Sequence, residues 1–172
     1  VNGDGYTDIL KRRNCTSAAC YGVWLNLQDD WDSTGRWRLP QNFSFVDMYG
    51  NDLGIRIADL NGDGLVDVVK RQSCTGSVCT GVLLNTGNDW QEDNAVWTVS
   101  ADYAFTTTTG NSGVRLADID GDGVTDLVKR VDCSSPTCTL NYESNGFAGF
   151  LLRSISEGNM TRETVSYATA TS

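Results

Sequence analysis

The sequence predicts an all-β protein: a partial β-propeller of about three four-stranded blades, followed by a C-terminal β-hairpin extension. Equivalent residues recur at an interval of 59, as in Lys11, Lys70 and Lys129. Short apolar runs of strand type alternate with Gly, Asn and Asp turn signals. No stretch keeps a 3.6-residue apolar period for three turns, which argues against long amphipathic helices. A fixed period of this size, with about four strands in each unit, is typical of propellers.

The second repeat shows the expected element order. A short strand at 54–58 enters an acidic loop, and a second strand at 65–70 leaves it. The cysteine-bounded segment 74–79 makes the next turn. A third strand follows at 81–85, and a weaker fourth lies around 95–99.

The repeats set the predicted boundaries. The repeat array covers residues 1–148, divided at about 1–53, 54–112 and 113–148, with the first repeat truncated, and a β-strand extension covers 149–172. In the extension we expect strands at 149–155 and 164–167 around a turn at 157–159. The first acidic loop lacks its leading Asp, so we expect the sequence to be a piece of a longer protein.

Charge and composition exclude several functions. The net charge is −9, and no histidine is present. A nucleic-acid partner would require a basic face, so none is expected. Without histidine, Ser-His-Asp and Cys-His catalysis and His-ligated zinc are excluded for this chain. No apolar run is long enough to cross a membrane.

Three acidic loops carry the strongest chemical signal. Oxygen-bearing side chains occupy loop positions 1, 3, 5 and 9, a Gly occupies position 6, and position 7 would offer its backbone carbonyl. This pattern forms the front half of an oxygen-rich Ca²⁺ loop, in which Gly permits the sharp turn. The predicted ligands are Asp59, Asn61, Asp63, Leu65 and Asp67; Asp118, Asp120, Asp122, Val124 and Asp126; and, in a partial loop, Asn2, Asp4, Tyr6 and Asp8.

The acidic loops have two other possible interpretations. An EF-hand would need a bidentate Glu at position 12, where Lys70 and Lys129 stand, so that motif is rejected. A Gly/Asp-rich hairpin turn without metal stays open, because Asn-Gly and Asp-Gly are ordinary turn signals. Carboxylates in the same positions of three loops favour metal.

Six cysteines form three pairs with four residues between the members. Their regular spacing favours a disulfide within each repeat, with zinc and free thiols as the alternatives. The expected bridges are Cys15–Cys20, Cys74–Cys79 and Cys133–Cys138. Disulfides would place the protein in an oxidising, extracytoplasmic setting, secreted or at the cell surface.

Two other residue types recur with the repeat. Trp31 and Trp90, with Trp37 and Trp97, are expected to pack between neighbouring blades, and a sugar-stacking platform is the alternative. The recurring Lys-Arg pairs, such as Lys70-Arg71, are expected at a solvated strand end or beside acidic neighbours.

The acidic loop, preceded by Gly-Ile-Arg-Ile-Ala and followed by Val-Leu-Leu-Asn-Thr-Gly, resembles FG-GAP/VCBS repeats. Such repeats build the propellers of integrin α chains and of the SpvB-like and Tc-toxin B components of bacterial Rhs-type toxins. The tail at 151–167 resembles the passage from that toxin propeller into the Rhs shell. The resemblance implies structural Ca²⁺ sites that brace each blade. The paired cysteines, and the missing Phe-Gly and Gly-Ala-Pro strings, depart from the family pattern.

The sequence and the resemblance suggest three possible functions. The first is a non-catalytic, Ca²⁺-stabilised propeller segment of a large secreted or surface Rhs/Tc-toxin-like protein. Its partners would be the other blades and the Rhs-like shell of the same chain, and another toxin component or a cell-surface ligand. The second is an integrin-like adhesion or glycan-binding module. The third is an enzyme with carboxylate acid/base chemistry, which is disfavoured because the carboxylates fill equivalent positions in every repeat.

Overall fold

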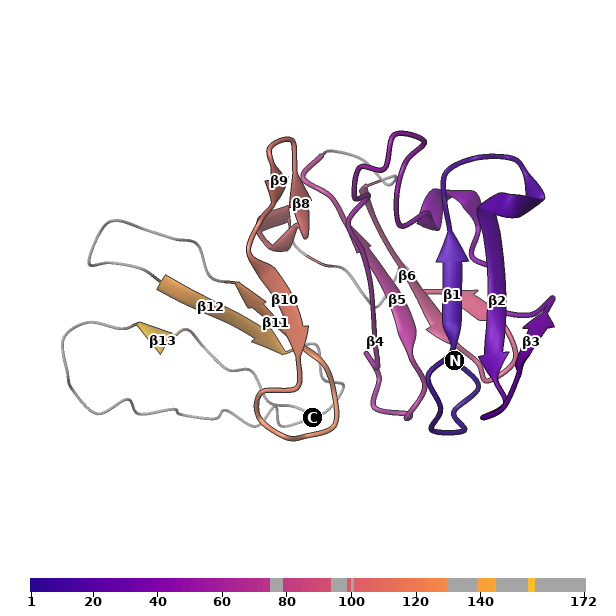
Figure 1. Cartoon of the computed structure of the whole chain (residues 1–172). Helices are drawn as coiled ribbons and strands as arrows, with labels where there is room; N and C mark the ends of the chain where they lie inside the picture. The colour runs from indigo at the N-terminus through magenta and orange to yellow at the C-terminus, as the bar shows by residue number, and fades with distance from the viewer. Residues whose placement is uncertain (75–78, 94–98, 100, 130–138, 145–154, 157–172) are drawn as a thin grey trace.

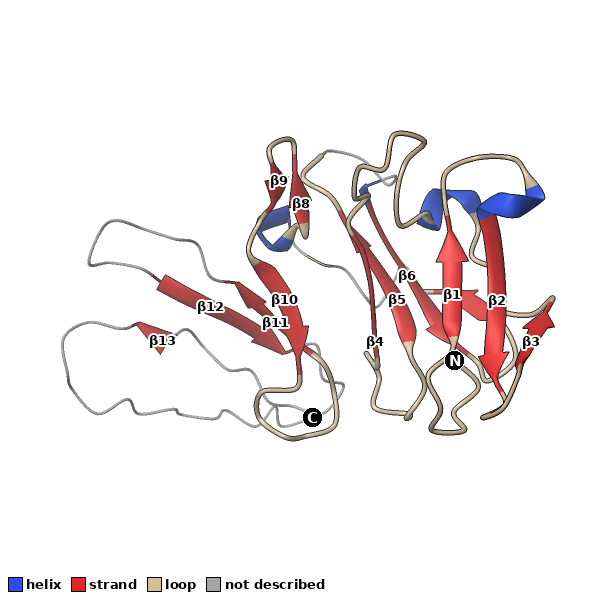
Figure 2. Cartoon of the chain, in the orientation of Figure 1, coloured by secondary structure: helices blue, strands red, loops and turns tan. Residues whose placement is uncertain are grey.

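The computed structural model describes residues 1–74, 79–93, 99, 101–129, 139–144 and 155–156 of the chain (Figure 1). The described part is all-β, with short 3₁₀ turns and no α-helix (Figure 2). Its strands form separate antiparallel sheets that lie in a row and do not close into a ring. Within these residues no helix is long and apolar enough to cross a membrane.

Three of the sheets repeat one plan. The first contains β1 (Ile9–Arg12), β2 (Tyr21–Asn26) and β3 (Trp31–Thr34). The second contains β4 (Ile55–Ala58), β5 (Asp67–Arg71), β6 (Thr80–Asn85) and β7 (Trp90–Glu92). The third contains β10 (Val114–Ala117), β11 (Asp126–Lys129), β12 (Thr139–Ser144) and β13 (Ile155–Ser156). A small hairpin of β8 (Thr106–Thr107) and β9 (Gly110–Asn111) precedes the third sheet.

Strand register reproduces the 59-residue period. Ala58 pairs with Asp67 between β4 and β5, and Ala117 pairs with Asp126 between β10 and β11. The loops at 59–67 and 118–126 therefore each join two hydrogen-bonded antiparallel strands, and the last Asp of each is the first residue of the second strand. The strands expected on both sides of the loop at 59–67 are confirmed, although the second begins at Asp67 and not at residue 65.

The two ends of the sheets differ in chemistry. The acidic loops lie together along the lower edge in Figure 1. The 3₁₀ turns η1 (Ala18–Cys20), η2 (Gln41–Phe43) and η4 (Ala101–Tyr103) lie toward the opposite edge, where the cysteine-bounded turns also begin. The acidic loops and the cysteine-bounded turns thus lie at opposite ends of the strands.

Apolar side chains fill the space between neighbouring sheets. One cluster includes Phe43, Ile55 and Val68 and joins the first sheet to the second. The other includes Leu60, Phe105 and Leu127 and joins the second sheet to the third. Face-to-face burial of alternating strand residues thus holds the sheets side by side.

The segments that connect the sheets are tied to both neighbours. The amide of Phe105 donates to the carbonyl of Arg71 at the end of β5. Lys129 Nζ donates to the Asp102 carbonyl in η4. One connection therefore contacts the sheet behind it and the sheet ahead of it.

Lys70, the equivalent of Lys129 in the second sheet, also donates to the carbonyl of a neighbouring turn. Lys70 is 7% exposed, and its Nζ donates to the Asn42 carbonyl at 2.6 Å. Burial lowers the pKa of Lys70. The expected solvated strand end is wrong here, because the long side chain crosses to a turn carbonyl and supplies it with a donor.

The tryptophans divide between core and surface. Trp37 is 2% exposed, and its Nε1 donates to Asn85 Oδ1 at 2.9 Å. Trp90 packs partly buried against the cluster between the first two sheets. Trp31 is 47% exposed, so packing between sheets is wrong for that residue. Trp97 lies outside the described residues.

Two of the three expected disulfides are confirmed. Cys15–Cys20 closes the turn between β1 and β2, and Cys74–Cys79 closes the turn between β5 and β6. In the second of these turns, the amide of Gln72 also donates to the Cys79 carbonyl at 2.8 Å. Cys133 and Cys138 lie outside the described residues. Disulfides indicate an extracellular or otherwise oxidising location.

The C-terminal segment is described only in small part. β13 pairs with β12 through Leu140↔Ile155 and Thr139↔Ser156. Residues 155–156, which fall in the predicted extension, thus form the fourth strand of the third sheet. The strand expected at 164–167 and its turn at 157–159 lie outside the described residues.

Candidate metal centre

Each acidic loop turns sharply at two glycines. Gly62 and Gly64 have φ of +75° and +83°, and Gly121 and Gly123 have φ of +81° and +87°. This left-handed region strains residues that carry a Cβ, so positions 4 and 6 of the loop require Gly. The resulting coil directs the side chains of alternate residues toward one side.

The first Asp of the loop at 59–67 fixes that coil. Asp59 Oδ1 accepts from the Gly62 amide and Oδ2 from the Gly64 amide, both at 2.8 Å. Asp63 Oδ1 accepts from the Leu65 amide at 2.8 Å. Asn61 Oδ1 accepts from the Asp63 amide at 3.1 Å. The predicted ligand oxygens therefore also shape the loop, and each carboxylate oxygen keeps a lone pair for a cation.

The loop at 118–126 repeats these contacts. Asp118 accepts from the amides of Gly121 and Gly123 at 2.7 and 3.1 Å. Asp120 accepts from the Asp122 amide at 3.1 Å, and Asp122 accepts from the Val124 amide at 2.8 Å. The two loops are therefore one structural unit used twice.

The N-terminal loop contains the same unit without the leading Asp. Asp4 Oδ1 accepts from the Tyr6 amide at 2.9 Å, and Asn2 Oδ1 accepts from the Asp4 amide at 3.3 Å. Asp8 accepts from the Asn26 amide at 2.9 Å and from the amino group of Val1. Four of the predicted ligands are thus arranged as in the other loops.

The last Asp of each loop is buried beneath it. Asp67 is fully buried and accepts from the amides of Leu60 and Asn85 at 2.9 and 2.8 Å. Asp126 is 1% exposed and accepts from the Ile119 amide at 3.0 Å through Oδ2. Its Oδ1 is buried without a hydrogen-bond partner. An unpaired buried carboxylate oxygen costs free energy unless a cation or donor meets it.

The strongest candidate for a metal ion is the loop at 118–126. Carboxylate oxygens of Asp118, Asp120 and Asp126 all lie within 4.8 Å of one another. Three hard oxygen ligands around one point, one of them the buried residue Asp126, suit Ca²⁺. The donor set therefore fits the cation that the sequence predicts, and this Asp triad, with Asp118 and Asp120 exposed and Asp126 buried, could bind a metal ion.

The pKa values of two loop carboxylates also favour a bound cation. The pKa of Asp67 is raised to about 6, chiefly by burial and also by the charges of Asp63 and Asp59, while two backbone hydrogen bonds oppose the shift. The pKa of Asp120 is also raised, by desolvation and by the charges of Asp122, Asp126 and Asp118. These shifts show that the loops hold negative charge at a cost that a bound cation would relieve.

The predicted ligand sets are gathered to different degrees. Among the described acidic residues, only the triad at 118–126 meets that 4.8 Å spacing. In the loop at 59–67, Asn61 occupies the place of Asp120, and both oxygens of Asp67 already accept amide hydrogen bonds. That loop keeps the same fold with one carboxylate fewer. Ligation by Leu65, Val124 or Tyr6 stays a prediction.

Sequence reasoning missed one residue that supports the site. The backbone amide of Asn85 donates to Asp67, and Asn85 Oδ1 accepts from the indole N–H of Trp37. Asn85 Nδ2 donates to the carbonyls of Val66 and Val1, at 3.2 and 2.7 Å. Asn85, the last residue of β6, therefore connects that strand both to the loop at 59–67 and to the N-terminal loop. The signal available was its 59-residue spacing from Asn26.

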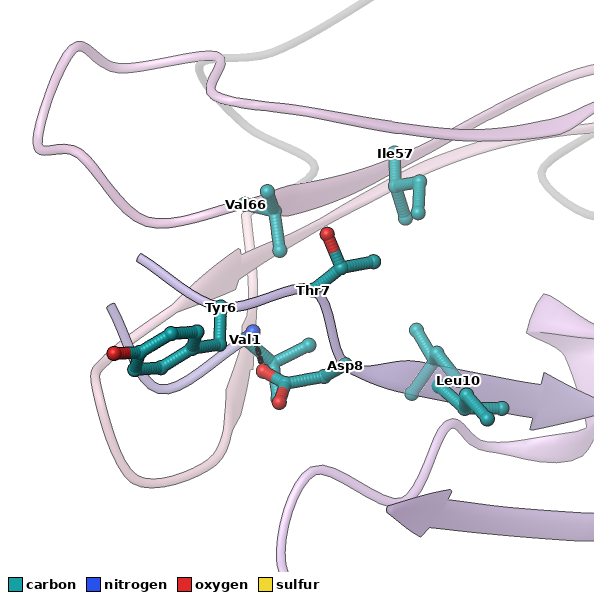
Figure 3. A pocket seen from close by; sticks show the side chains of 8 residues that line it. Val1, Tyr6, Thr7, Asp8, Leu10, Ile57 and Val66 are labelled. Carbon is teal, nitrogen blue, oxygen red and sulfur yellow. Dashed lines mark hydrogen bonds and ion pairs between the residues drawn. The ribbon is translucent and has the colours of Figure 1, made fainter. Parts of the chain in front are cut away.

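An apolar pocket lies beside the N-terminal loop (Figure 3). It has a volume of about 510 Å³ and is lined by Leu10, Ile57, Val66 and neighbouring residues. Its one carboxylate, Asp8, is already engaged by the Val1 amino group. The polar residues that line the pocket are Tyr6, Thr7 and Asp8, and the rest of its lining is apolar.

The chain matches no protein family, no curated protein and no solved structure.

Proposed function

We propose that the chain is a non-catalytic structural module whose acidic loops bind Ca²⁺ and brace its sheets. One observation carries the proposal: the buried, unpartnered Asp126 Oδ1 beneath a loop whose Asp118, Asp120 and Asp126 oxygens converge within 4.8 Å. A bound Ca²⁺ would satisfy that oxygen and join the exposed loop to the buried start of β11.

The structural role follows from where each loop lies. Each of the loops at 59–67 and 118–126 connects two paired strands, and its last Asp is the first residue of a strand that packs between sheets. A cation there would fix the hairpin at the sheet edge and relieve carboxylate repulsion. The repeated position in each sheet suits a repeated structural duty better than a single catalytic centre.

The wider context is a second part of the proposal. We interpret the three sheets as blades of an FG-GAP/VCBS-type propeller within a secreted or surface Rhs/Tc-toxin-like protein. The 59-residue register and the disulfides support this interpretation. In that context the module would give structural support and dock another component. An adhesion module is the alternative, favoured by the 47% exposure of Trp31.

Thermal unfolding with and without cation tests the structural role. We expect millimolar Ca²⁺ to raise the melting temperature of the chelated chain, and Mg²⁺ to do so poorly, because it dehydrates reluctantly. Asp122→Ala should reduce the Ca²⁺ response. Asp29→Ala, at an exposed acidic residue outside the loops, should leave the response intact. Equal responses in the two variants would contradict the proposal.

A further inference from the structure

Neighbouring acidic loops are packed directly against one another. A Cβ placed on Gly62 would lie 3.1 Å from Cγ2 of Val124. Gly62 is position 4 of the loop at 59–67, and Val124 is position 7 of the loop at 118–126. The same contact occurs one step earlier, where a Cβ on Gly3 would lie 2.8 Å from Cδ2 of Leu65. The side chain at position 7 of one loop thus rests on the Gly of the preceding loop.

A backbone hydrogen bond also joins the loops at 59–67 and 118–126. The amide of Thr125 donates to the carbonyl of Asp59 at 3.1 Å. Asp59 is the residue whose two carboxylate oxygens hold the amides of Gly62 and Gly64. The backbone of one loop therefore positions the first predicted ligand of its neighbour.

Burial shows that this contact is an interface. Leu60, at position 2 of the loop at 59–67, is buried in the cluster between the second and third sheets. Ile119, at the same position of the next loop, is 44% exposed. The loop at 59–67 is thus covered by its neighbour through apolar packing, while this part of the loop at 118–126 is open to solvent.

We propose that the loops at 59–67 and 118–126 bind divalent cations with positive cooperativity. This inference rests on the proposed Ca²⁺ function and adds its regulation. A cation in the loop at 118–126 would fix Val124 and Thr125. It would thereby order the Gly62 contact and the Asp59 carbonyl before the second cation binds. By linkage, the second cation raises the affinity of the first loop by the same factor.

Repulsion between the two cations opposes the coupling. The loop at 118–126 is mostly exposed to solvent, and so is the tip of the loop at 59–67, at residues 62–64, so physiological salt, with a Debye length of about 8 Å, weakens that repulsion. The packing contact and hydrogen bond between the loops do not depend on such screening. We expect the net coupling at physiological salt to be positive, with a factor of about fivefold, at the lower end of the usual range.

The test is Ca²⁺ titration of the full chain by calorimetry, in an Asp4→Ala background that removes the partial N-terminal loop. Asp122→Ala leaves the loop at 59–67, and Asp63→Ala leaves the loop at 118–126. We expect the chain with both loops to bind two cations about fivefold more tightly than the product of the single-loop constants predicts. Circular dichroism checks that each variant folds, and Asp63→Asn and Asp122→Asn replace any that does not.

A second cycle tests the contact itself. Repeating the titrations with Val124→Ala should bring the coupling factor close to one, since the cycle cancels any direct effect on each loop's own affinity. Ile119→Ala, an aliphatic truncation at an exposed position of the same loop, should keep the coupling. Independent sites, or unchanged coupling in Val124→Ala, would overturn the inference while leaving Ca²⁺ binding in place. Absence of Ca²⁺ binding in every chain would overturn the proposed function as well.

Discussion

The substitution Asp126→Asn should change stability in opposite directions with and without Ca²⁺. The oxygen that accepts from Ile119 is retained in the amide, and the other oxygen, buried without a partner, becomes a donor facing carboxylates. Asp118 and Asp120 oxygens lie within 4.8 Å of Asp126, so each pair repels by about 1 kcal/mol even with water-like screening. Removing one charge should therefore stabilise the metal-free protein by about 2 kcal/mol.

The assay is differential scanning calorimetry in chelator and in about 1 mM Ca²⁺. For a chain of this length, about 2 kcal/mol corresponds to a rise in melting temperature of roughly 4–8 °C in chelator. With Ca²⁺, the wild-type protein should gain about 1.4 kcal/mol per site for a dissociation constant of about 0.1 mM, and the Asp126→Asn variant should lose the contribution of its loop. A variant that is destabilised in chelator and keeps the full Ca²⁺ response would refute the reasoning.

Three further predictions concern other parts of the chain. Because burial raises the pKa of Asp67 from 3.8 to about 6, the stability of the metal-free protein should fall as pH rises through that range, which thermal melts in chelator at pH 5 and 7 check. The affinity for Ca²⁺ should fall as pH drops below 6, which Ca²⁺ titrations at the same two pH values check. Replacing Cys74 and Cys79 together with Ser should cost roughly 2 kcal/mol, measured by denaturant unfolding, and a loss near zero would rule out a stabilising bridge. Lys70→Met should cost about 1–2 kcal/mol, since the Asn42 carbonyl loses its donor, whereas Lys11→Met, at an exposed lysine, should be nearly neutral.

Local patterns predicted the hairpins well. The spacing of Asp59, Asn61, Asp63 and Asp67 around two glycines defined each turn, and the 59-residue period carried that turn to the next sheet. The cysteine spacing likewise predicted the bridges at 15–20 and 74–79. Both signals are short in sequence, so their geometry is nearly complete within a few residues.

Contacts between repeats could not be predicted in the same way. Lys70 has the pattern of a solvated strand end, yet its amine reaches a carbonyl 28 residues earlier. Trp31 and Trp90 occupy equivalent positions but differ in burial, because their surroundings depend on which sheet lies beside them. The contact between Gly62 and Val124 joins two copies of the acidic loop that are far apart in the sequence. Such contacts depend on how neighbouring sheets pack.

Calorimetric titration of the chelated protein with Ca²⁺ tests the central claim most directly. The account predicts binding to the loops at 59–67 and 118–126 with dissociation constants of about 10⁻⁴–10⁻³ M, the range of extracellular modules. Asp63→Ala and Asp122→Ala should each remove one binding event. If no Ca²⁺ binds at millimolar concentration, the loops are plain hairpin turns and the claim of a metal-braced module is wrong.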